Sequence, residues 1–434
     1  MRLRLTLNEF GVVCVLLFFG TLGYLPILMP NTGGALTAQG QMQQVHTINH
    51  VVLAVVWGGI FLCLLQARFR LRFDLLSAKA SLAYGVFALS SVVWSSQRVS
   101  TFSSGISLFI STIFAIYLVS RFTRERLVTL LGWTMYILAG ASALFAVALP
   151  QYGLDHFAHS GAWQGVYGQK NALGLVMVYG IGIALSLTPQ TFAERMWKSG
   201  LLLLCIAEAG LSESREAWVA GLLVLILYAS LKFYCRFAMR SRGVVLGLSF
   251  GIVASFGVLV LAAWKPLLSL LGRDPTLTGR TALWQEVLEK CAIHPLNGYG
   301  LGTFWGSADA LPVYMVVHWV PTSAHNGFLE CLLELGLVGL LILVFLILYA
   351  IRNMVSILIS QPALDYSKAW MFLIFTIILL NMTADITGIV NSISWLLLTC
   401  SACALEQSAN ESRRFPAPPR QVFAGSHNLL SAPL

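Results

Sequence analysis

The sequence has few charged residues for its size. Asp, Glu, Lys and Arg together make up 10% of its 434 residues, whereas 57% are hydrophobic. A soluble domain carries about 25% charged residues, so the composition excludes an ordinary soluble protein. The apolar runs are long enough to cross a bilayer as helices, and they lack the period-two alternation of a membrane β-barrel. We therefore expect an all-α, polytopic integral membrane protein built as one helical bundle.

Other features that are missing exclude further classes. The net charge is +9, but the basic residues form no cluster or arm, so we expect no nucleic-acid partner. The eight Cys are scattered, with only Cys291 in an expected outward loop, so no disulfide framework is predicted. Cys400 and Cys403 stand in an apolar run, where small helix-packing residues are the ordinary interpretation. The stretch 30–47, expected to be the first outward loop, contains no acid.

The apolar runs predict about twelve membrane-spanning helices joined by loops. The first run follows Arg2 and Arg4, is too long for the core of a signal peptide and lacks a clear A-x-A cleavage site, so it is expected to stay as a span. The expected spans are 10–29, 48–66, 75–94, 102–120, 127–149, 172–189, 199–212, 216–231, 243–264, 327–350, 369–388 and 391–406.

Lys and Arg divide unequally between the two sides that these spans define. With the N-terminus inside, 20 of the 27 basic residues fall on the inner side and seven on the outer side. Cytoplasmic loops of membrane proteins carry such an excess, so we expect both termini in the cytoplasm. Residues 1–406 are predicted to form a single membrane domain with one long outward loop at about 265–326. The tail, 407–434, is rich in Ser, Pro and Ala and is predicted to be disordered.

The long outward loop contains a predicted amphipathic helix. Apolar residues within 283–291, including Trp284, share one face, so we expect this short helix to lie on the bilayer surface. Arg280 stands at its start, where a guanidinium adds to the positive end of the helix dipole and attracts phosphate. The following turn around Tyr299 reads Gly-Tyr-Gly-Leu-Gly. It is either a plain return to the membrane or a place where backbone approaches a ligand.

Two other outward turns carry basic residues at helix starts. Arg215 lies at the tip between the seventh and eighth spans, where it either binds an anion or extends toward the membrane surface. Lys170 and Asn171 open the sixth span. Trp163 and Tyr167 precede them, as interfacial aromatic residues or as platforms for a sugar.

The stretch SAHNGFLECLLELGLVGLLILVF, 323–345, places polar residues at the start of a span. His325 can accept a proton from a hydroxyl near neutral pH, and Asn326 can orient it or bind substrate. A structural histidine is the alternative interpretation. Glu330 and Glu334 lie one helical turn apart, so both should face protein or water rather than lipid.

Four of these stretches together carry a resemblance to a known family. They are YGQKNALG (167–174), SESREAWVA (212–220), GRTALWQEVLEKCAIHPLNGYGLGTFW (279–305) and AHNGFLECLLELGLVGL (324–340). In order and spacing they resemble the O-antigen ligase and polysaccharide polymerase superfamily of bacterial envelope proteins. QKNALG is similar to the succinoglycan-type exopolysaccharide polymerases. One departure is Asn381-Met382-Thr383-Ala384-Asp385, where that subgroup often has N-x-T-E-S.

The resemblance implies a membrane glycosyltransferase of the bacterial inner membrane with a periplasmic active site. Its substrate would be a sugar chain on a polyprenyl diphosphate, and it would need no metal or other cofactor. Arg215 and Arg280 would hold the diphosphate, and His325 would be the base. Lys170, Asn171, Asn326, Tyr299 and Trp284 would bind substrate. A flippase and a chain-length regulator are the protein partners that the resemblance implies.

Two alternatives to a polymerase remain at the level of sequence. A ligase that attaches finished chains to the lipid A core shares these motifs and differs in its acceptor. A secondary transporter also commonly has twelve spans with both ends inside, but such folds are built from repeats. The sequence has no internal repeat, and its long outward loop is atypical of transporters.

Overall fold

A computed structural model describes residues 3–20, 56–61, 71–156, 160–234, 241, 244, 280–360, 371, 373–378 and 393–414. Within these ranges the chain is helical, and its only β pairing is one isolated bridge between Leu154 and Trp163. The principal helices are α1 (Leu7–Gly20), α3 (Leu76–Ser90), α4 (Arg98–Arg121), α5 (Arg124–Ala148), α6 (Pro150–Gly153), α7 (Lys170–Ser186), α8 (Phe192–Leu211), α9 (Arg215–Tyr234), α11 (Arg280–Ile293), α12 (Leu311–Val317), α13 (Gly327–Ser360) and α15 (Ile393–Arg414).

Five of these helices are long and apolar enough to cross a membrane, which makes the chain a polytopic membrane protein. They are Leu76–Val93, Arg98–Arg121, Arg124–Ala148, Arg215–Tyr234 and Gly327–Ile359, each at a predicted span. Shorter apolar helices cover 7–19 and 170–186, where two more spans are predicted. Several predicted elements lie mostly or wholly outside the described residues. They are nearly all of span 243–264, all of its outward continuation 265–279, most of 48–66 and 369–388, and the 381–385 element.

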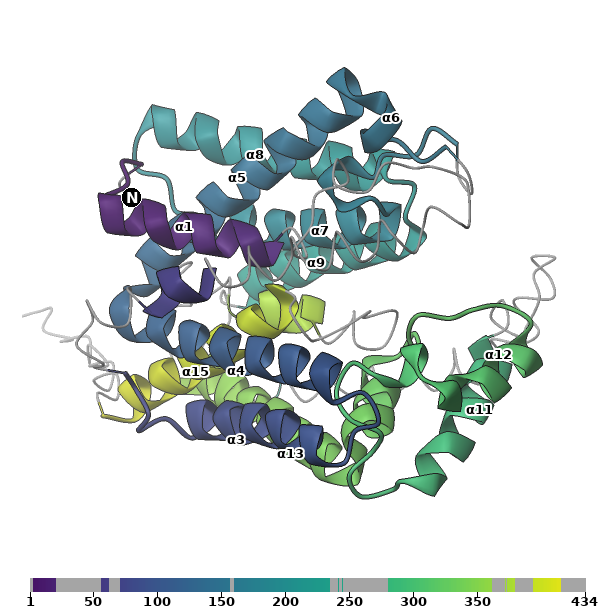
Figure 1. Ribbon diagram of the computed structural model, residues 1–434. Helices are drawn as coiled ribbons and strands as arrows, with labels where there is room; N and C mark the ends of the chain where they lie inside the picture. The colour runs from purple at the N-terminus through teal and green to yellow at the C-terminus, as the bar shows by residue number, and fades with distance from the viewer. Residues whose placement is uncertain are drawn as a thin grey trace, which may run out of the picture.

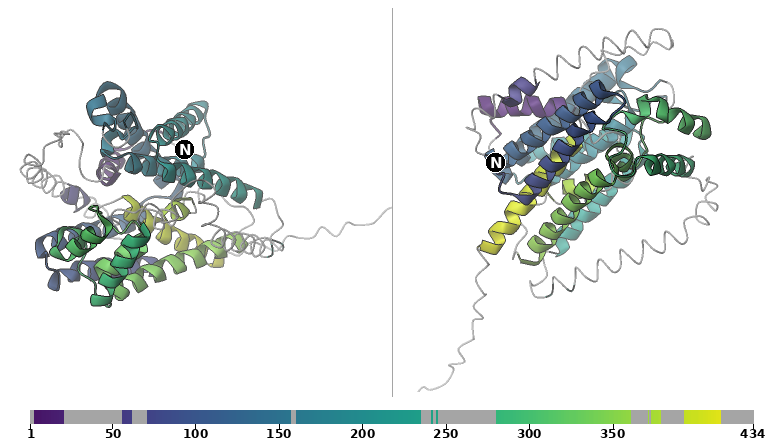
Figure 2. Two further views of the ribbon diagram at one scale, coloured as in Figure 1. Left: turned by 90° about the vertical axis from the view of Figure 1, so that its right-hand side faces the viewer. Right: turned by 60° about the horizontal axis from the view of Figure 1, so that its bottom comes forward.

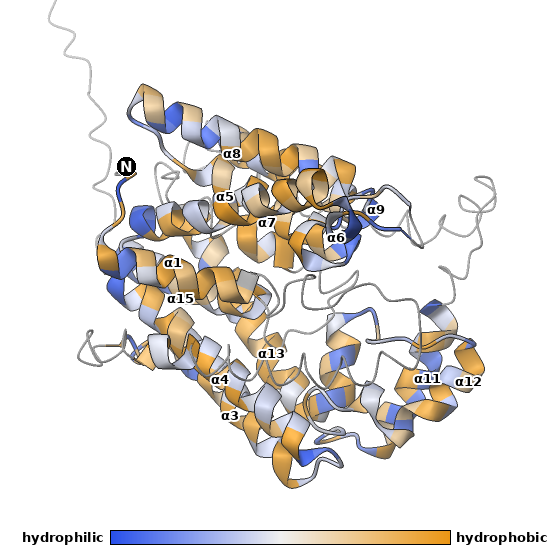
Figure 3. Ribbon diagram, turned by 45° about the horizontal axis from the view of Figure 1, so that its top comes forward, coloured by the Kyte–Doolittle hydropathy of each residue, from blue (hydrophilic) through white to orange (hydrophobic). Residues whose placement is uncertain are grey.

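The helices pack as two groups (Figure 1). One group contains α3, α4, α13 and α15, and the other contains α5, α7, α8 and α9, with α1 packed against α5. The views in Figure 2 show the same grouping from two further directions. Hydrophobic residues run along α1, α5 and α7 in Figure 3, as expected for helices that contact lipid and one another rather than water.

Loops that were predicted to share a side of the membrane do meet. At one end, the Trp94 indole donates to the Asn297 carbonyl at 3.0 Å, and the Gln97 amide donates to the Gly306 carbonyl at 2.7 Å. At the other end, the Glu406 carboxylate accepts from the backbone N–H of Leu76 at 2.9 Å. The helices α11 and α12 lie at the first end, opposite the N-terminus (Figure 1).

The last helix is longer than predicted. α15 continues through Arg414, so 407–414 is helical and the predicted disordered tail starts too early. The Arg124 guanidinium donates to the Glu411 carboxylate at 2.8 Å, which gives this extension a partner on α5. Polar composition suggested a tail, but an ion pair and continued helical hydrogen bonding hold these residues in place.

The helix α13 contains a break at Gly336. Its φ of 63° and ψ of −167° are not helical, and a Cβ there would fall 2.3 Å from the Leu296 carbonyl carbon. The break frees backbone groups that the outward loop then satisfies. Leu337 N–H donates to the Pro295 carbonyl at 2.8 Å, and the Glu334 carbonyl accepts from Gly300 N–H at 2.8 Å. Irregular backbone in a membrane helix needs such protein partners.

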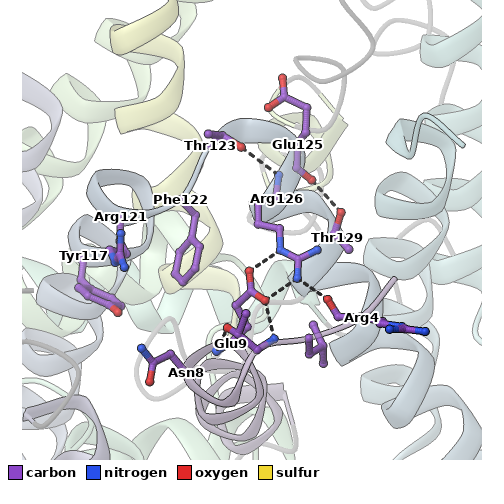
Figure 4. A pocket seen from close by; sticks show the side chains of 12 residues that line it. Arg4, Asn8, Glu9, Tyr117, Arg121, Phe122, Thr123, Glu125, Arg126 and Thr129 are labelled. Carbon is purple, nitrogen blue, oxygen red and sulfur yellow. Dashed lines mark hydrogen bonds and ion pairs between the residues drawn. The ribbon is translucent and has the colours of Figure 1, made fainter. Parts of the chain in front are cut away.

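The end of the bundle near the N-terminus contains a cavity of about 990 Å³ between α1 and the turn joining α4 to α5 (Figure 4). The Arg126 guanidinium donates to both carboxylate oxygens of Glu9 and, at 2.8 Å, to the Arg4 carbonyl. This guanidinium lowers the pKa of the Glu9 carboxyl to about 2. The ion pair therefore ties the first helix to the bundle just before the first predicted span.

Replacing Glu9 by Gln should destabilise the protein in a pH-dependent way. A hydrogen bond to a charged group contributes about 1.5–3 kcal/mol, so we expect a loss of that size in the unfolding free energy at neutral pH. Because the folded-state pKa lies below the ordinary 4.5, the stabilisation is complete above pH 4.5 and disappears as the pH falls through about 2.

Thermal unfolding of the detergent-purified proteins between pH 7 and pH 3 measures this effect. The difference in unfolding temperature between wild type and Glu9→Gln should become smaller as the pH falls. Glu125→Gln is the matched control, because Glu125 lines the same cavity but is exposed. An equal gap at every pH would contradict the assignment of the ion pair.

Candidate functional site

The helix α11 belongs to a small core of its own beside the membrane bundle. Leu283, Val287 and Cys291 are buried against α12 and the start of α13. The prediction that the apolar face of α11 lies on the bilayer is therefore wrong, because this face packs on protein. Burial raises the pKa of the Cys291 thiol to about 11, so that thiol stays protonated and acts as an apolar packing group.

Two helix starts with arginine meet at this end of the molecule. Arg280, the first residue of α11, donates from Nη2 to Oε1 of Glu216 at 2.8 Å. Glu216 follows Arg215, which is the first residue of α9 and has an exposed side chain. Arg215 and Arg280 are 65 positions apart in the sequence. The ion pair of Arg280 with Glu216, the neighbour of Arg215, brings the two helix starts together. Each helix start adds partial positive charge to its guanidinium.

The same helix connects Arg280 to the histidine loop. Trp284 lies four residues after Arg280, on the same helical face and about 6 Å further along the axis. Its indole Nε1 donates to the Ala324 carbonyl at 2.9 Å, directly before His325. The structure therefore brings Arg215, Arg280, Trp284 and His325 into one contiguous region.

His325 lies in an unusual backbone conformation. Its φ is +49°, in the left-handed region that non-glycine residues rarely occupy. Its N–H donates to the Ser323 Oγ at 3.3 Å, and its ring stacks on Trp319 with centroids 5.5 Å apart. The imidazole is half-buried, so it remains accessible. Strained turns of this kind gather at functional sites because their surroundings must hold them.

Asn326 has a clear structural task. Its Oδ1 accepts from the N–H groups of Phe328 at 3.0 Å and Leu329 at 3.2 Å, which caps the first turn of α13. The cap fixes the direction in which the chain enters the helix, and so helps to fix His325. Its predicted contact with substrate stays a prediction.

The two carboxylates in α13 are buried against protein, as predicted. Glu330 is 8% exposed and Glu334 is 7% exposed. Glu330 accepts from the Trp305 indole at 2.7 Å and from Ala324 N–H at 2.6 Å, whereas Glu334 accepts from Gly302 N–H at 2.7 Å. Both acids therefore hold the outward loop onto the helix start.

Tyr299, a predicted substrate-binding residue, forms hydrogen bonds within the protein. Its hydroxyl donates to the Lys290 carbonyl at 3.3 Å, and its N–H donates to the Leu333 carbonyl at 3.1 Å. Burial raises the pKa of this hydroxyl, which keeps it a donor. Gly298, at φ +64°, would place a Cβ 2.4 Å from the Glu334 carbonyl carbon. The glycine-rich turn thus approaches α13 closely, which favours the interpretation as a return to the membrane helix.

Lys170 and Asn171 lie near the arginine pair. Lys170 begins α7, and its Nζ donates to the Glu213 carbonyl at 3.4 Å, two residues before Arg215. Asn171 is half-buried beside it. Trp163 N–H donates to the Leu211 carbonyl at 2.9 Å, which anchors the loop before α7 to the same hairpin tip. This loop therefore forms the other border of the region.

Sequence reasoning did not find the partners that assemble the region. Glu216, Trp305 and Trp319 were not identified as site residues. Glu330 had a usable signal, since an acid in an apolar run needs a partner. The ion pair of Glu216 and the stacking of Trp319 depend on contacts between distant segments and left no local pattern.

Known proteins are similar to this part of the chain. The O-antigen ligase family matches residues 200–344, a segment that contains Arg215, Arg280 and His325. Over this segment the chain is similar to the O-antigen ligase family. The resemblance predicted from the motifs is thereby confirmed, and the region assembled by α9, α11 and the start of α13 lies within the family segment.

The chain is also similar to a curated relative over a longer stretch. It is 25% identical over 291 residues to the exopolysaccharide production protein ExoQ of Rhizobium meliloti (strain 1021). The alignment covers 64% of this chain and 66% of the relative, just under two thirds of the relative's length.

Proposed function

We propose that this protein polymerises oligosaccharide repeat units, carried on a polyprenyl diphosphate, into an exopolysaccharide. The observation that carries the proposal is the contiguous region in which two helix-start arginines are linked through α11 to a half-buried histidine. The reaction takes place at the periplasmic face of a bacterial inner membrane, with both chain termini in the cytoplasm. This orientation rests on the excess of Lys and Arg in the inner loops.

The arginines hold the leaving group. A diphosphate ester carries strong negative charge, which grows as the bond to the anomeric carbon breaks. Guanidinium groups bind phosphate oxygens in pairs, and the starts of α9 and α11 add partial positive charge. Arg280 exchanges its contact with Glu216 for the diphosphate, while Arg215 and Lys170 approach from the neighbouring turn. Because these cations neutralise the leaving group, the step does not require a metal ion.

His325 activates the acceptor. Its imidazole removes the proton from an acceptor hydroxyl as the oxygen bonds to the anomeric carbon. The bond between that carbon and the diphosphate oxygen breaks at the same time, and the polyprenyl diphosphate departs. A single displacement of this kind inverts the anomeric centre. Asn171, Asn326, Trp284 and Tyr299 border the proposed sugar site.

A ligase is the second candidate function. The family description, O-antigen ligase, supports a ligase, whereas the name of the relative supports production of an exopolysaccharide. The QKNALG element at 169–174 lies outside the family segment and supports the polymerase. The two enzymes share donor chemistry and differ in acceptor. A flippase that supplies the donor and a chain-length regulator are the proposed partners.

Purified protein supplied with each acceptor tests the proposal. With lipid-linked repeat units alone, we expect a ladder of lengthening lipid-linked chains on a gel. A single transfer to added lipid A core, without a ladder, would instead identify a ligase. The reaction should proceed unchanged in excess chelator. Absence of any product with both acceptors would contradict the proposed function.

A further inference from the structure

The side chains of Glu330 and Trp284 both form hydrogen bonds with the backbone of Ala324. The Glu330 Oε2 accepts from Ala324 N–H at 2.6 Å, and the Trp284 Nε1 donates to the Ala324 carbonyl at 2.9 Å. Ala324 itself is fully buried. Both polar groups of the residue before His325 are therefore fixed by buried or partly buried side chains.

The second carboxylate oxygen of Glu330 connects Ala324 to the outward loop. Its Oε1 accepts from the Trp305 indole at 2.7 Å, so one carboxylate joins the loop at Trp305 to the turn at Ala324. The carboxylate also lies within electrostatic reach of the His325 imidazole. A negative charge at this place stabilises the imidazolium that forms when His325 accepts a proton.

We propose that Glu330 is a positioning residue, which fixes His325 in its left-handed turn and balances the charge that His325 gains in the reaction. This inference rests on the proposed function. The turn is strained, so its geometry depends on the contacts around it. Small displacements of a catalytic group lower the rate strongly. A buried carboxylate that accepts hydrogen bonds from two donors prevents such displacements.

Glutamine cannot replace Glu330 in this arrangement. Both of its partners, the Trp305 indole and Ala324 N–H, are donors. A carboxylate accepts at both oxygens, whereas a carboxamide accepts at one and donates at the other. One donor would therefore face another donor in either orientation of the amide. Glu330→Gln changes this contact with little change in side-chain volume.

Glu334 provides a matched control on the same helix. It is equally buried and holds backbone of the same loop, through Gly302 N–H at 2.7 Å. Its carboxylate holds Gly302, whereas that of Glu330 holds Ala324, the residue before His325. Both Gln variants lose one charge-assisted hydrogen bond of the loop, so both should unfold at lower temperature. The turnover of folded protein should fall much further in Glu330→Gln than in Glu334→Gln.

The test measures kcat, KM and thermal unfolding for wild type, Glu330→Gln and Glu334→Gln with lipid-linked repeat units. We expect Glu330→Gln to lower kcat by about 10-fold to 100-fold at unchanged KM, with a much smaller change for Glu334→Gln. Trp284→Phe should also lower kcat. Because both residues act on one peptide segment, the effects of Trp284→Phe and Glu330→Gln should combine to less than their product.

The outcomes separate the inference from the proposed function. Equal kcat in the two Gln variants, or full multiplicativity with Trp284→Phe, would overturn the positioning role while leaving the polymerase intact. An inactive wild-type protein would instead overturn the proposed function, on which the inference rests. A loss confined to unfolding temperature would show that Glu330 only stabilises the fold.

Discussion

His325→Ala is expected to abolish visible polymer while the protein stays folded in the membrane. General-base catalysis contributes about 10²–10⁴-fold, so chain growth should fall by that factor. The side chain is half-buried at the end of the outward loop, so its removal should leave the buried core intact. The measurement is initial chain growth with lipid-linked repeat units, normalised to the amount of folded protein.

His325→Asn separates loss of the base from loss of the turn. Asn occupies the left-handed conformation more readily than most residues, so the backbone at φ +49° should survive. The amide has no useful basicity, and activity should fall as far as in His325→Ala. Near-normal chain growth in either variant would refute His325 as the base.

Arg280→Ala and Arg215→Ala should each lower chain growth by about 10²–10³-fold, because each removes a group that stabilises charge in the transition state. Arg→Lys at either position should restore little, since a lysine lacks the planar pair of donors that matches phosphate oxygens. Initial rates at saturating donor measure this loss. Unfolding temperature should change little, since both side chains are partly or fully exposed.

Glu216→Gln is the control for a purely structural arginine. Arg280 donates to Glu216, so a stabilising role would be lost when either partner is changed. A catalytic Arg280 predicts instead that Glu216→Gln retains most of the activity, because the guanidinium remains in place. Equal losses in Arg280→Ala and Glu216→Gln would contradict a role in holding the diphosphate.

The sequence was most informative where long periodic or apolar runs determine structure. Runs such as 102–120 and 127–149 predicted spans that α4 and α5 confirm, because a bilayer admits few alternatives to an apolar helix. Helix starts at Arg215 and Arg280 were also predictable, since capping residues and amphipathic spacing mark them. The count of twelve spans stays a prediction, because several fall on residues outside the described ranges.

The contacts that complete the region were not predictable from local patterns. The apolar face of α11 could pack on lipid or protein, and only the fold decides that Leu283 and Val287 are covered by α12 and α13. The break at Gly336 depends on the loop at Pro295 supplying a carbonyl to Leu337. Likewise, Glu330 acquires its meaning only from Trp305 and Ala324, which reach it through the folded loop.

The proposed function requires that this region extends glycan chains with His325 as its base. The most direct measurement incubates purified wild type and His325→Asn with polyprenyl-diphosphate-linked repeat units and resolves the products by length. We expect a ladder from wild type, with inverted linkages, and unconverted repeat units from the variant. A ladder of equal length and amount from both proteins would contradict it.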